Sequence, residues 1–328
     1  MGTKKLFLHI GLHKTGTSAI QFALYHARDA LLKEGFLYPQ SVAWEDFSHH
    51  RLFMPFWGRK DYNPVFDQLE EEAARTEHHS LIISSEFLPN TYEQADRFPA
   101  LWDRISRLAE EIEIILYARR QDRLAESVFK QWVKSNDRQL AVTPSQFLDG
   151  KNRIKMDFLQ YCRVWSAMPK VTKLHLRSYD LERRALLQSF MDILGLPLGL
   201  LDGNENVRAN ATLDGPQLAY RHYFNRFKMP PELANGLLQY ILGHLPNTPK
   251  IEPFSLEERQ ALVADYAEGN EEAFRVFGNC AQPFDNEFRT EGAELVHPSS
   301  TDIIAFLHQM AESDAILTDK IFKHLIKV

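Results

Sequence analysis

The sequence predicts an α/β protein: a parallel sheet with helices on both faces, followed by a mostly helical C-terminal part. Strand-like apolar runs alternate with helix-like segments over about the first 200 residues, and only helix-like segments come after them. The chain has 328 residues, of which 44% are hydrophobic, and this is ample apolar surface for a packed core.

The composition argues against several classes of function. The net charge of −6 and the 25% of charged residues are near the average for soluble proteins, which disfavours a general affinity for nucleic acid or anionic membranes. Only two cysteines occur, Cys162 and Cys280, so a disulfide framework is excluded and a reducing compartment is favoured. No apolar run approaches the length of a membrane span, and the first strand-like run leaves no room for a signal peptide. We expect a cytoplasmic protein; the sequence leaves its oligomeric state open.

The first element is the strand-like run Leu6–Ile10, which stops at Gly11 and precedes a helix-like segment at Ala19–Lys33. Gly11 and Gly16 allow the connecting loop to turn tightly and to approach a ligand closely. The N–H groups of such a loop and the positive end of the following helix attract an anion. The sequence therefore predicts a strand, a phosphate loop and a helix.

Side chains of this loop also suit a phosphate. Lys14 supplies a positive charge, and Thr17 and Ser18 supply hydroxyl donors. The two glycines have the spacing of the ATPase motif G-x-x-x-x-G-K-S/T, but Thr17 stands where that motif has its lysine. A magnesium–triphosphate site is therefore not indicated. The alternative is an ordinary glycine turn with one solvated lysine.

Further elements follow in alternation. Strand-like runs are predicted at Leu81–Ser85, Ile112–Ala118 and Val171–Leu176. Helices are predicted at Phe66–Thr76, Ala100–Glu111, from Asp122 onward, and at Phe158–Ala167, Leu181–Leu194, Pro216–Phe227, Pro231–Leu245, Ser255–Phe277 and Ser300–Val328. Groups suited to ligand binding follow four of the strands, where parallel sheets bind ligands; they are Lys14, Glu86, Arg119 and Tyr179.

The chain is expected to divide near the end of its α/β part. The segment Asn204–Asp214 reads as an irregular loop, and Gly278–Ser299 as the boundary to a C-terminal appendage. We predict a domain over residues 1–280 and a helical extension over 281–328 packed on it.

The loop resembles the 5′-phosphosulfate loop of the sulfotransferases that use 3′-phosphoadenosine 5′-phosphosulfate (PAPS). That loop carries lysine, a small residue, glycine and two hydroxyl residues, as Lys14 to Ser18 do here. The resemblance implies that Lys14 contacts the bridging region of the donor and that Thr15–Ser18 cradle its 5′-phosphate. The donor-binding residues it implies in this loop are His13, Lys14, Thr15, Gly16, Thr17 and Ser18.

A second motif resembles the 3′-phosphate signature of the same family. Ser127 follows Arg119 by eight positions across a predicted strand-to-helix junction, as in that signature. By this resemblance Arg119 and Ser127 close on one phosphate from two sides. Arg120 is the alternative ligand because the register at the end of an element is uncertain. Surface ion pairs of both arginines are the other interpretation.

Glu86 is the predicted base of a transfer reaction. A partly desolvated carboxylate at a strand end is expected to have a raised pKa, which suits proton removal from an alcohol. Sulfotransferases place a histidine or a glutamate after the corresponding strand, and Ser84–Pro89 resembles the glutamate form. The competing bases are His49 and His50, which we otherwise interpret as cleft or surface groups rather than metal ligands. A surface or helix-capping carboxylate is the alternative for Glu86.

Tyr179 follows a strand at the place where the tyrosine of the family tends to stack on adenine; a buried tyrosine with a bonded hydroxyl is as plausible. Two features of the family are missing. No glycine- and lysine-rich C-terminal loop is found, and Ala19 stands where a tryptophan is usual. These departures weaken the expected adenine and C-terminal contacts.

Taken over about the first 200 residues, the chain resembles the bacterial, carbohydrate-type branch of PAPS-dependent sulfotransferases, which have a P-loop nucleotide-kinase-like fold. The resemblance implies sulfuryl transfer to a carbohydrate or glycolipid hydroxyl, with adenosine 3′,5′-bisphosphate (PAP) as product and no metal. Aromatic and histidine residues between Phe36 and Trp57 are expected to line a sugar site. The alternatives are a nucleotide-dependent kinase and a nucleotide-binding protein without turnover.

Overall fold

A computed structural model describes residues 3–149, 155–201, 212–288 and 292–326. The chain forms two compact units, each built from three segments. The first unit comprises Met1–Arg120, Met156–Ala209 and Tyr266–Asp285, and the second comprises Gln121–Lys155, Asn210–Asp265 and Asn286–Val328. The predicted domains 1–280 and 281–328 are each continuous in sequence, and that division stays a prediction.

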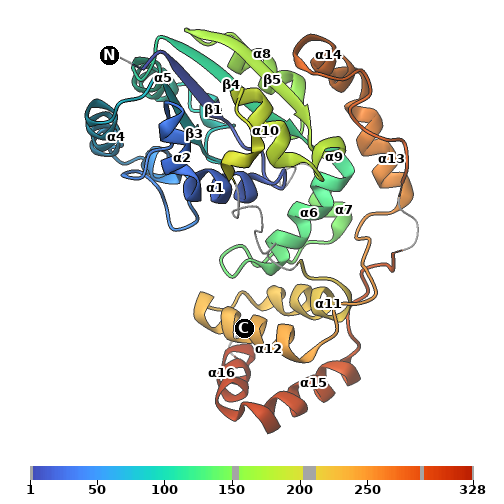
Figure 1. The fold of residues 1–328 in the computed structure, drawn as a ribbon. Helices are drawn as coiled ribbons and strands as arrows, with labels where there is room; N and C mark the ends of the chain where they lie inside the picture. The colour runs from blue at the N-terminus through green and yellow to red at the C-terminus, as the bar shows by residue number, and fades with distance from the viewer. Residues whose placement is uncertain (1–2, 150–154, 202–211, 289–291, 327–328) are drawn as a thin grey trace. The chain divides into compact units, whose positions relative to one another are not determined.

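The first unit contains a parallel sheet, which confirms the predicted α/β class (Figure 1). Its described strands are β1 (Lys5–His9), β2 (Phe36–Leu37), β3 (Ser80–Ser84), β4 (Glu111–Ala118) and β5 (Val171–Ser178). They lie in the order β2-β3-β1-β4-β5, and every pair is parallel. His9, the last residue of β1, pairs with Ser84 on one side and with Ile115 on the other. The sheet is therefore wound in both directions from β1, the position at which such folds bind ligands.

Helices cover both faces of this sheet because alternate strand residues point to opposite sides. On one face Phe7, Ile82 and Ile115 pack with the helices α1 (Thr17–His26), α2 (Arg28–Lys33) and α10 (Leu186–Leu194). On the other face α8 (Phe158–Ser166) packs against β4 and β5, and its Trp165 ring meets the Trp102 ring of α5 (Phe98–Arg107). The other α-helices among the described residues of this unit are α3 (Met54–Trp57), α4 (Asn63–Arg75), α9 (Tyr179–Glu182) and α14 (Ala267–Phe277).

The helix predicted over Ala19–Lys33 is two helices. The chain leaves helical geometry at Ala27, with φ −91° and ψ 4°, between α1 and α2. The Arg28 guanidinium donates to the carbonyl of Tyr25 at 3.0 Å, so a side chain satisfies part of this helix end. The sequence pattern continues across the break because Leu24 and Leu31 both face the same core.

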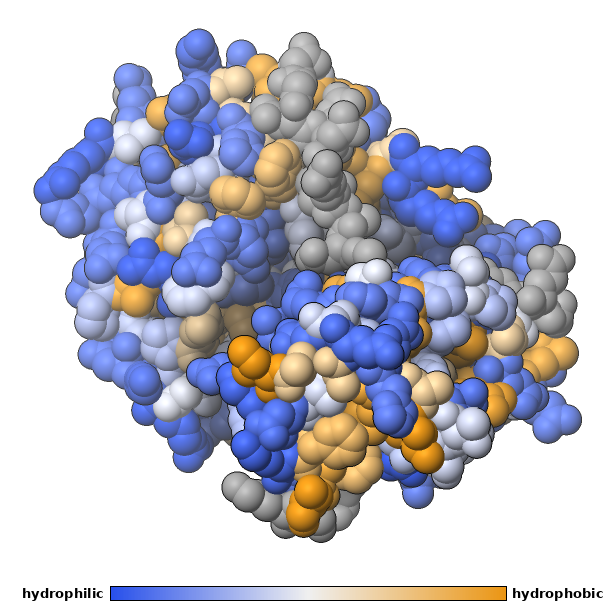
Figure 2. Space-filling model, turned by 90° about the horizontal axis from the view of Figure 1, so that it is seen from below, coloured by the Kyte–Doolittle hydropathy of each residue, from blue (hydrophilic) through white to orange (hydrophobic). Residues whose placement is uncertain are grey.

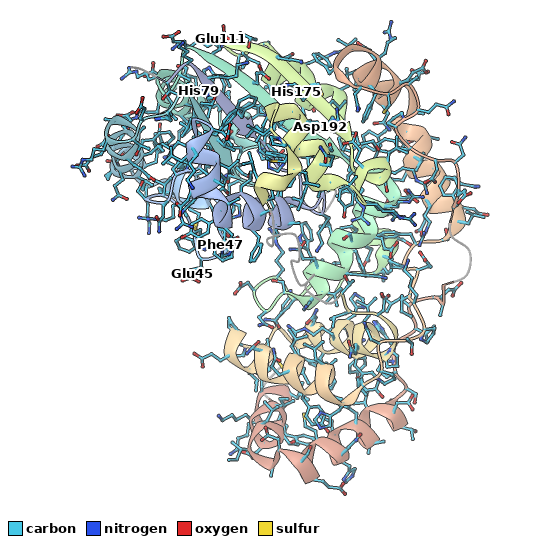
Figure 3. The ribbon with its side chains drawn as sticks, in the orientation of Figure 1. Glu45, Phe47, His79, Glu111, His175 and Asp192 are labelled. Atoms are coloured by element: carbon cyan, nitrogen blue, oxygen red, sulfur yellow. The ribbon has the colours of Figure 1, made fainter. Side chains whose placement is uncertain are left out.

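An ion network links three neighbouring strands of the sheet. Glu113 of β4 accepts from Lys5 of β1 at 2.5 Å and lies 2.7 Å from His175 Nε2 of β5 (Figure 3, where His175 is labelled). Burial raises the pKa of Glu113, but its hydrogen bonds to His175 and Lys5 outweigh burial and bring the pKa to about 2. This carboxylate therefore ties the strands β1, β4 and β5 together.

The second unit is mostly helical over its described residues, as predicted for the C-terminal part, with one isolated β-bridge between Ile251 and Ala293. Its helices are α6 (Gln121–Lys134), α7 (Pro144–Leu148), α11 (Gly215–Phe224), α12 (Pro231–His244), α13 (Leu256–Asp265), α15 (Ser300–Ser313) and α16 (Ala315–Leu325). The single helices predicted at Ser255–Phe277 and Ser300–Val328 are each two helices. The side chain of Asp314 accepts from the N–H of Leu317. It therefore caps α16 and separates this helix from α15. Most of the predicted loop Asn204–Asp214 lies outside the described residues.

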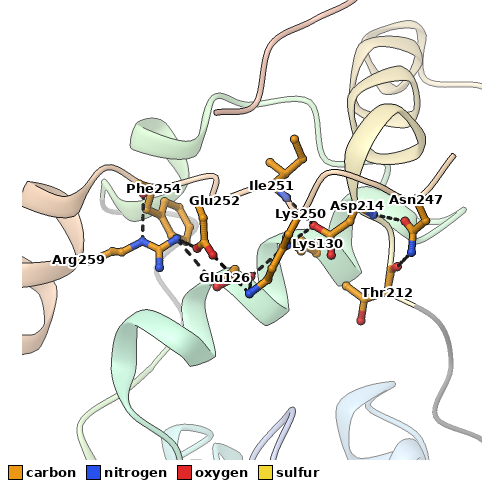
Figure 4. A network of polar contacts seen from close by, with 10 residues as sticks. All are labelled: Glu126, Lys130, Thr212, Asp214, Asn247, Lys250, Ile251, Glu252, Phe254 and Arg259. Carbon is orange, nitrogen blue, oxygen red and sulfur yellow. Dashed lines mark hydrogen bonds and ion pairs between the residues drawn. The ribbon is translucent and has the colours of Figure 1, made fainter. Parts of the chain in front are cut away.

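Buried charges hold parts of the second unit together (Figure 4). Lys130 of α6 lies 3.0 Å from Glu126 Oε1 and 2.5 Å from Asp214 Oδ1, and its side chain is 2% exposed. Arg259 of α13 pairs with Glu252, whose other oxygen lies 3.3 Å from Lys250 Nζ. Charges this deeply buried stabilise the fold only as a complete set.

Replacing Lys130 with methionine is expected to lower the free energy of unfolding by about 3 kcal/mol, because Glu126 and Asp214 stay buried without their shared cation. Urea denaturation measures this loss. The control is Lys323→Met, which removes an exposed lysine paired with Asp319 and is expected to cost less than about 0.5 kcal/mol. Equal losses in the two variants would contradict the structural role of the buried network.

Among the described residues, no helix is both long and apolar enough to cross a membrane. The face drawn in Figure 2 carries apolar side chains in small groups between hydrophilic ones.

Candidate functional site

The loop between β1 and α1 adopts left-handed backbone conformations at two positions, Lys14 with φ 67° and Gly16 with φ 79°. Gly16 is further constrained because an added Cβ would lie 2.3 Å from Leu186 Cδ2 and 3.1 Å from Tyr179 Cε2. At Gly11 an added Cβ would lie 2.1 Å from Thr17 Cγ2. Both glycines predicted from the motif are therefore required by close packing around the loop.

Hydroxyl groups of the loop make contacts within the protein, and their predicted role in donor binding stays a prediction. Thr15 is fully buried and its hydroxyl donates to Leu12 O at 2.7 Å, so it holds the loop itself. Thr17 is 2% exposed and its hydroxyl donates to the Glu86 carboxylate. Ser18 alone of these hydroxyl residues is exposed, in the first turn of α1. The Thr17 hydroxyl is expected to donate to the phosphate, and in this structure it donates to Glu86.

The amino end of α1 opens at this loop. Gly16 O accepts from the N–H groups of Ala19 and Ile20, which are the first bonds of the helix. The N–H groups of Thr17 and Ser18 therefore belong to the orphan donors of the helix start. Together with the helix dipole they favour an anion at this position.

Two other strand ends meet the loop. Arg119 follows β4, and its Nη1 donates to the backbone carbonyl of Lys14 at 3.0 Å. The Arg119 guanidinium also lies over the ring of Tyr179, 5.5 Å from its centroid. Tyr179 follows β5 and its ring approaches Gly16. The structure thus brings together Lys14, Arg119 and Tyr179, which the sequence placed at three strand ends.

Arg120 points elsewhere. Its side chain is 1% exposed, and its Nη1 donates to Asp285 O at 2.7 Å and to Asp285 Oδ1 at 2.9 Å. Its backbone N–H donates to Asp180 Oδ2 at 2.7 Å. Of the two arginines that the sequence left open, Arg119 is the one beside the loop. Ser127 belongs to α6 of the second unit, so its pairing with Arg119 on one phosphate stays a prediction.

Glu86, two residues after β3, lies against the same loop. One carboxylate oxygen accepts from Thr17, and the other lies 3.5 Å from His13 Nδ1. Burial raises the pKa of Glu86, but the hydrogen bonds from His13 and Thr17 and the charges of His13 and His50 outweigh it, so the pKa is held below its ordinary value. The prediction of a raised pKa was wrong, because the sequence does not reveal these two loop partners.

The competing histidines are both close to β3. His49 is fully buried; Ser84 N donates to its Nδ1 at 3.0 Å and its Nε2 lies 3.0 Å from Pro39 O. His50 lies 2.8 Å from Ser85 Oγ through Nδ1 and 3.6 Å from Asp46 Oδ2 through Nε2. The sequence analysis interpreted both as cleft or surface groups, but the structure buries both of them.

No group of three or more His, Cys, Asp or Glu side chains suited to a metal ion occurs in the described ranges. The predicted absence of a metal from the reaction stays a prediction.

Two fully buried histidines make stability depend on pH. Burial lowers the pKa of His9 and of His49 to about 4, from an ordinary value of 6.5. The unfolded chain therefore binds protons that the folded chain does not, and stability present above pH 6.5 is lost as the pH falls toward 4. Each histidine accounts for at most about 3 kcal/mol of this loss. The measurement is urea denaturation at about pH 7 and about pH 4.5. We expect the urea midpoint to fall between these pH values, and to fall less in His49→Gln than in the wild type. Equal urea midpoints of the wild type at both pH values would contradict this prediction.

Most of the aromatic residues between Phe36 and Trp57, which were expected to line a sugar site, are buried in the hydrophobic core. Phe36, Tyr38, Phe53 and Phe56 are buried, whereas Trp44 and Trp57 are 40% and 38% exposed. Trp57 Nε1 donates to Phe87 O at 2.8 Å, which fixes the indole beside the residue that follows Glu86. Phe87 is itself 36% exposed, and its ring meets that of His50 at 4.5 Å. The exposed aromatic surface near Glu86 thus consists of Trp57 and Phe87.

No family model matches the chain, and no curated protein matches its sequence. Three solved structures show a distant likeness. A sulfotransferase from Alicyclobacillus acidocaldarius is 14% identical with a TM-score of 0.38, over 71% of this chain and 95% of that one. Mouse sulfotransferase SULT7A1, complexed with PAP, is 14% identical with a TM-score of 0.37, over 84% and 86%. A retinol dehydratase, in complex with androsterone and inactive cofactor PAP, is 12% identical with a TM-score of 0.28, over 84% and 80%.

Proposed function

We propose that this chain is a sulfotransferase that moves a sulfuryl group from PAPS to an acceptor hydroxyl. The observation that carries the proposal is the loop from Gly11 to Ser18, where Lys14 and the amino end of α1 meet Arg119. Such a combination of helix N–H groups and fixed cations suits a ligand with several phosphate groups.

The proposed donor site uses the loop for the phosphosulfate. Lys14 and the N–H groups at the start of α1 face the 5′-phosphate, and the exposed Ser18 hydroxyl adds a donor. Arg119, with Ser127 as its proposed partner, takes the 3′-phosphate, and Tyr179 offers a ring face for adenine. Support for this arrangement comes from the contact of Arg119 with both the Lys14 carbonyl and the Tyr179 ring.

In the proposed reaction the acceptor oxygen attacks sulfur in line as the bond from sulfur to the 5′-phosphate oxygen breaks. Lys14 and the loop N–H groups stabilise the charge that develops on the leaving phosphate. Glu86 provides the negative charge that favours removal of the acceptor proton; its lowered pKa keeps it ionised at neutral pH.

For the acceptor we propose a hydroxyl of a carbohydrate or a glycolipid. Trp57 and Phe87 support this choice because both rings are more than one third exposed and both lie next to the segment that carries Glu86. Flat aromatic faces of this kind pack against the C–H side of a sugar ring.

The test is incubation of the purified chain with radiolabelled PAPS and a panel of glycans and glycolipids, with and without EDTA. We expect label in a glycan and formation of PAP in both conditions. Phosphate transfer from ATP that requires magnesium, with no transfer from PAPS, would instead identify a kinase.

A further inference from the structure

His13 is the exposed member of a pair with Glu86. Its side chain is 53% exposed, whereas that of Glu86 is 23% exposed, and the His13 Nδ1 lies 3.5 Å from Glu86 Oε2. Because Nδ1 faces the carboxylate, Nε2 lies on the opposite edge of the ring and points away from it. The imidazole is therefore the part of the pair that a substrate reaches first.

We propose that the proton of the acceptor hydroxyl passes to His13 Nε2, and that Glu86 is a positioning residue that holds and balances the imidazole. The inference deepens the proposed sulfuryl transfer and rests on it. It assigns the base to a loop residue that the sequence analysis had counted only among the donor contacts.

Glu86 is poorly placed to take the proton itself. Both of its oxygens face loop side chains, one toward the Thr17 hydroxyl and the other toward His13. Its Cγ lies 3.3 Å from the position of a Cβ on Gly11, so the side chain fits closely beneath the loop. A carboxylate held in this way has a fixed orientation. It can therefore orient a neighbouring base, which here is His13.

Other histidines near β3 are less suitable. His9 and His49 are fully buried. His50 is 9% exposed, with one ring nitrogen toward Ser85 and the other toward Asp46. His13 thus has the most accessible imidazole of the four.

The proposed step balances as follows. The bond from the acceptor oxygen to sulfur forms while the bond from sulfur to the 5′-phosphate oxygen breaks, and PAP leaves with that electron pair. The acceptor proton moves to Nε2, which makes an imidazolium whose charge Glu86 offsets. The proton then passes to water. The neighbouring residue, Lys14, faces the leaving oxygen, so one loop supplies both the base and the cation.

The experiment compares His13→Ala, His13→Gln and Glu86→Gln with the control His26→Ala, which removes an exposed histidine at the end of α1. Conversion of PAPS to PAP is followed with water and with the panel of glycans and glycolipids as acceptors, and PAP binding is measured by calorimetry. Both His13 variants are expected to be about 100-fold slower, with PAP affinity changed by less than about threefold. Added imidazole should restore part of the rate to His13→Ala. Glu86→Gln should be slower than wild type but gain nothing from imidazole, and His26→Ala should match wild type.

Full activity in the His13 variants would overturn the inference, and so would a loss of PAP affinity as large as the loss of rate. A slow Glu86→Gln beside fast His13 variants would make Glu86 the direct base. Failure of the proposed function looks different. Wild-type protein that binds no PAP, or binds PAP without transfer to water or to any member of the glycan and glycolipid panel, would remove the proposed reaction and this inference together.

Discussion

Replacing Lys14 with alanine is expected to weaken PAP binding about 10- to 100-fold. A hydrogen bond to a charged group contributes about 1.5 to 3 kcal/mol, and each 1.4 kcal/mol is about tenfold in affinity. The backbone of the loop should survive the change. Alanine has the same difficulty as lysine at a φ of 67°, and Arg119 bonds the carbonyl of this residue rather than its side chain.

Lys33→Ala is the matched control, because it removes the same charge from an exposed position at the end of α2. We expect it to bind PAP like the wild type. Calorimetric titration measures both variants, and the loss in Lys14→Ala should shrink at high salt, as expected for a half-buried charge within reach of solvent ions. Unchanged affinity in Lys14→Ala would show that this ammonium does not contact the ligand.

Gly16→Ala is expected to lower the free energy of unfolding by about 2 to 3 kcal/mol and to reduce PAP affinity more than about 100-fold. An L residue is strained at φ 79°, and its Cβ would lie 2.3 Å from Leu186 Cδ2. Relief of that contact has to displace either the buried Leu186 side chain or the start of α1, and the second movement displaces the N–H groups proposed to bind the phosphate.

Gly195→Ala separates the cost of the strained backbone conformation from the cost of the close contact with Leu186. Gly195 has φ 72° at the end of α10, but nothing lies within 4 Å of an added Cβ. This variant should therefore show only the backbone cost of about 1 kcal/mol and bind PAP normally. Urea denaturation and calorimetry report the two effects. If Gly16→Ala resembled Gly195→Ala in both measurements, close packing around the loop would not matter for the site.

Local patterns were sufficient to predict much of the fold. The apolar run at β1, the glycines after it and the periodic segment of α1 are all signals within about 25 residues. The strands β3, β4 and β5 were found in the same way, and their order follows from their parallel pairing only in the structure. Helix breaks at Ala27 and Asp314 were missed, because the apolar spacing continues through the first and a capping side chain makes the second.

Contacts within the site were beyond such patterns because they join distant residues. Thr17 and Glu86 are 69 positions apart, and Lys14 and Arg119 are 105 apart. The choice between Arg119 and Arg120 depends on Asp285, which is 165 positions from Arg120. The same is true of the pKa of Glu86, whose direction is set by His13 and Thr17 and not by burial alone.

The most direct test of the central claim is calorimetric titration of the wild-type chain with PAP, with ADP–magnesium as the comparison. We predict that PAP binds with a Kd in the micromolar range and that ADP–magnesium binds at least about tenfold more weakly. The reasons are that Arg119 is proposed to bind a 3′-phosphate, which ADP does not have, and that the loop lacks the lysine of the ATPase motif. Binding of ADP–magnesium without binding of PAP would contradict the account and indicate a kinase. Binding of neither would reduce the loop after β1 to an ordinary glycine turn.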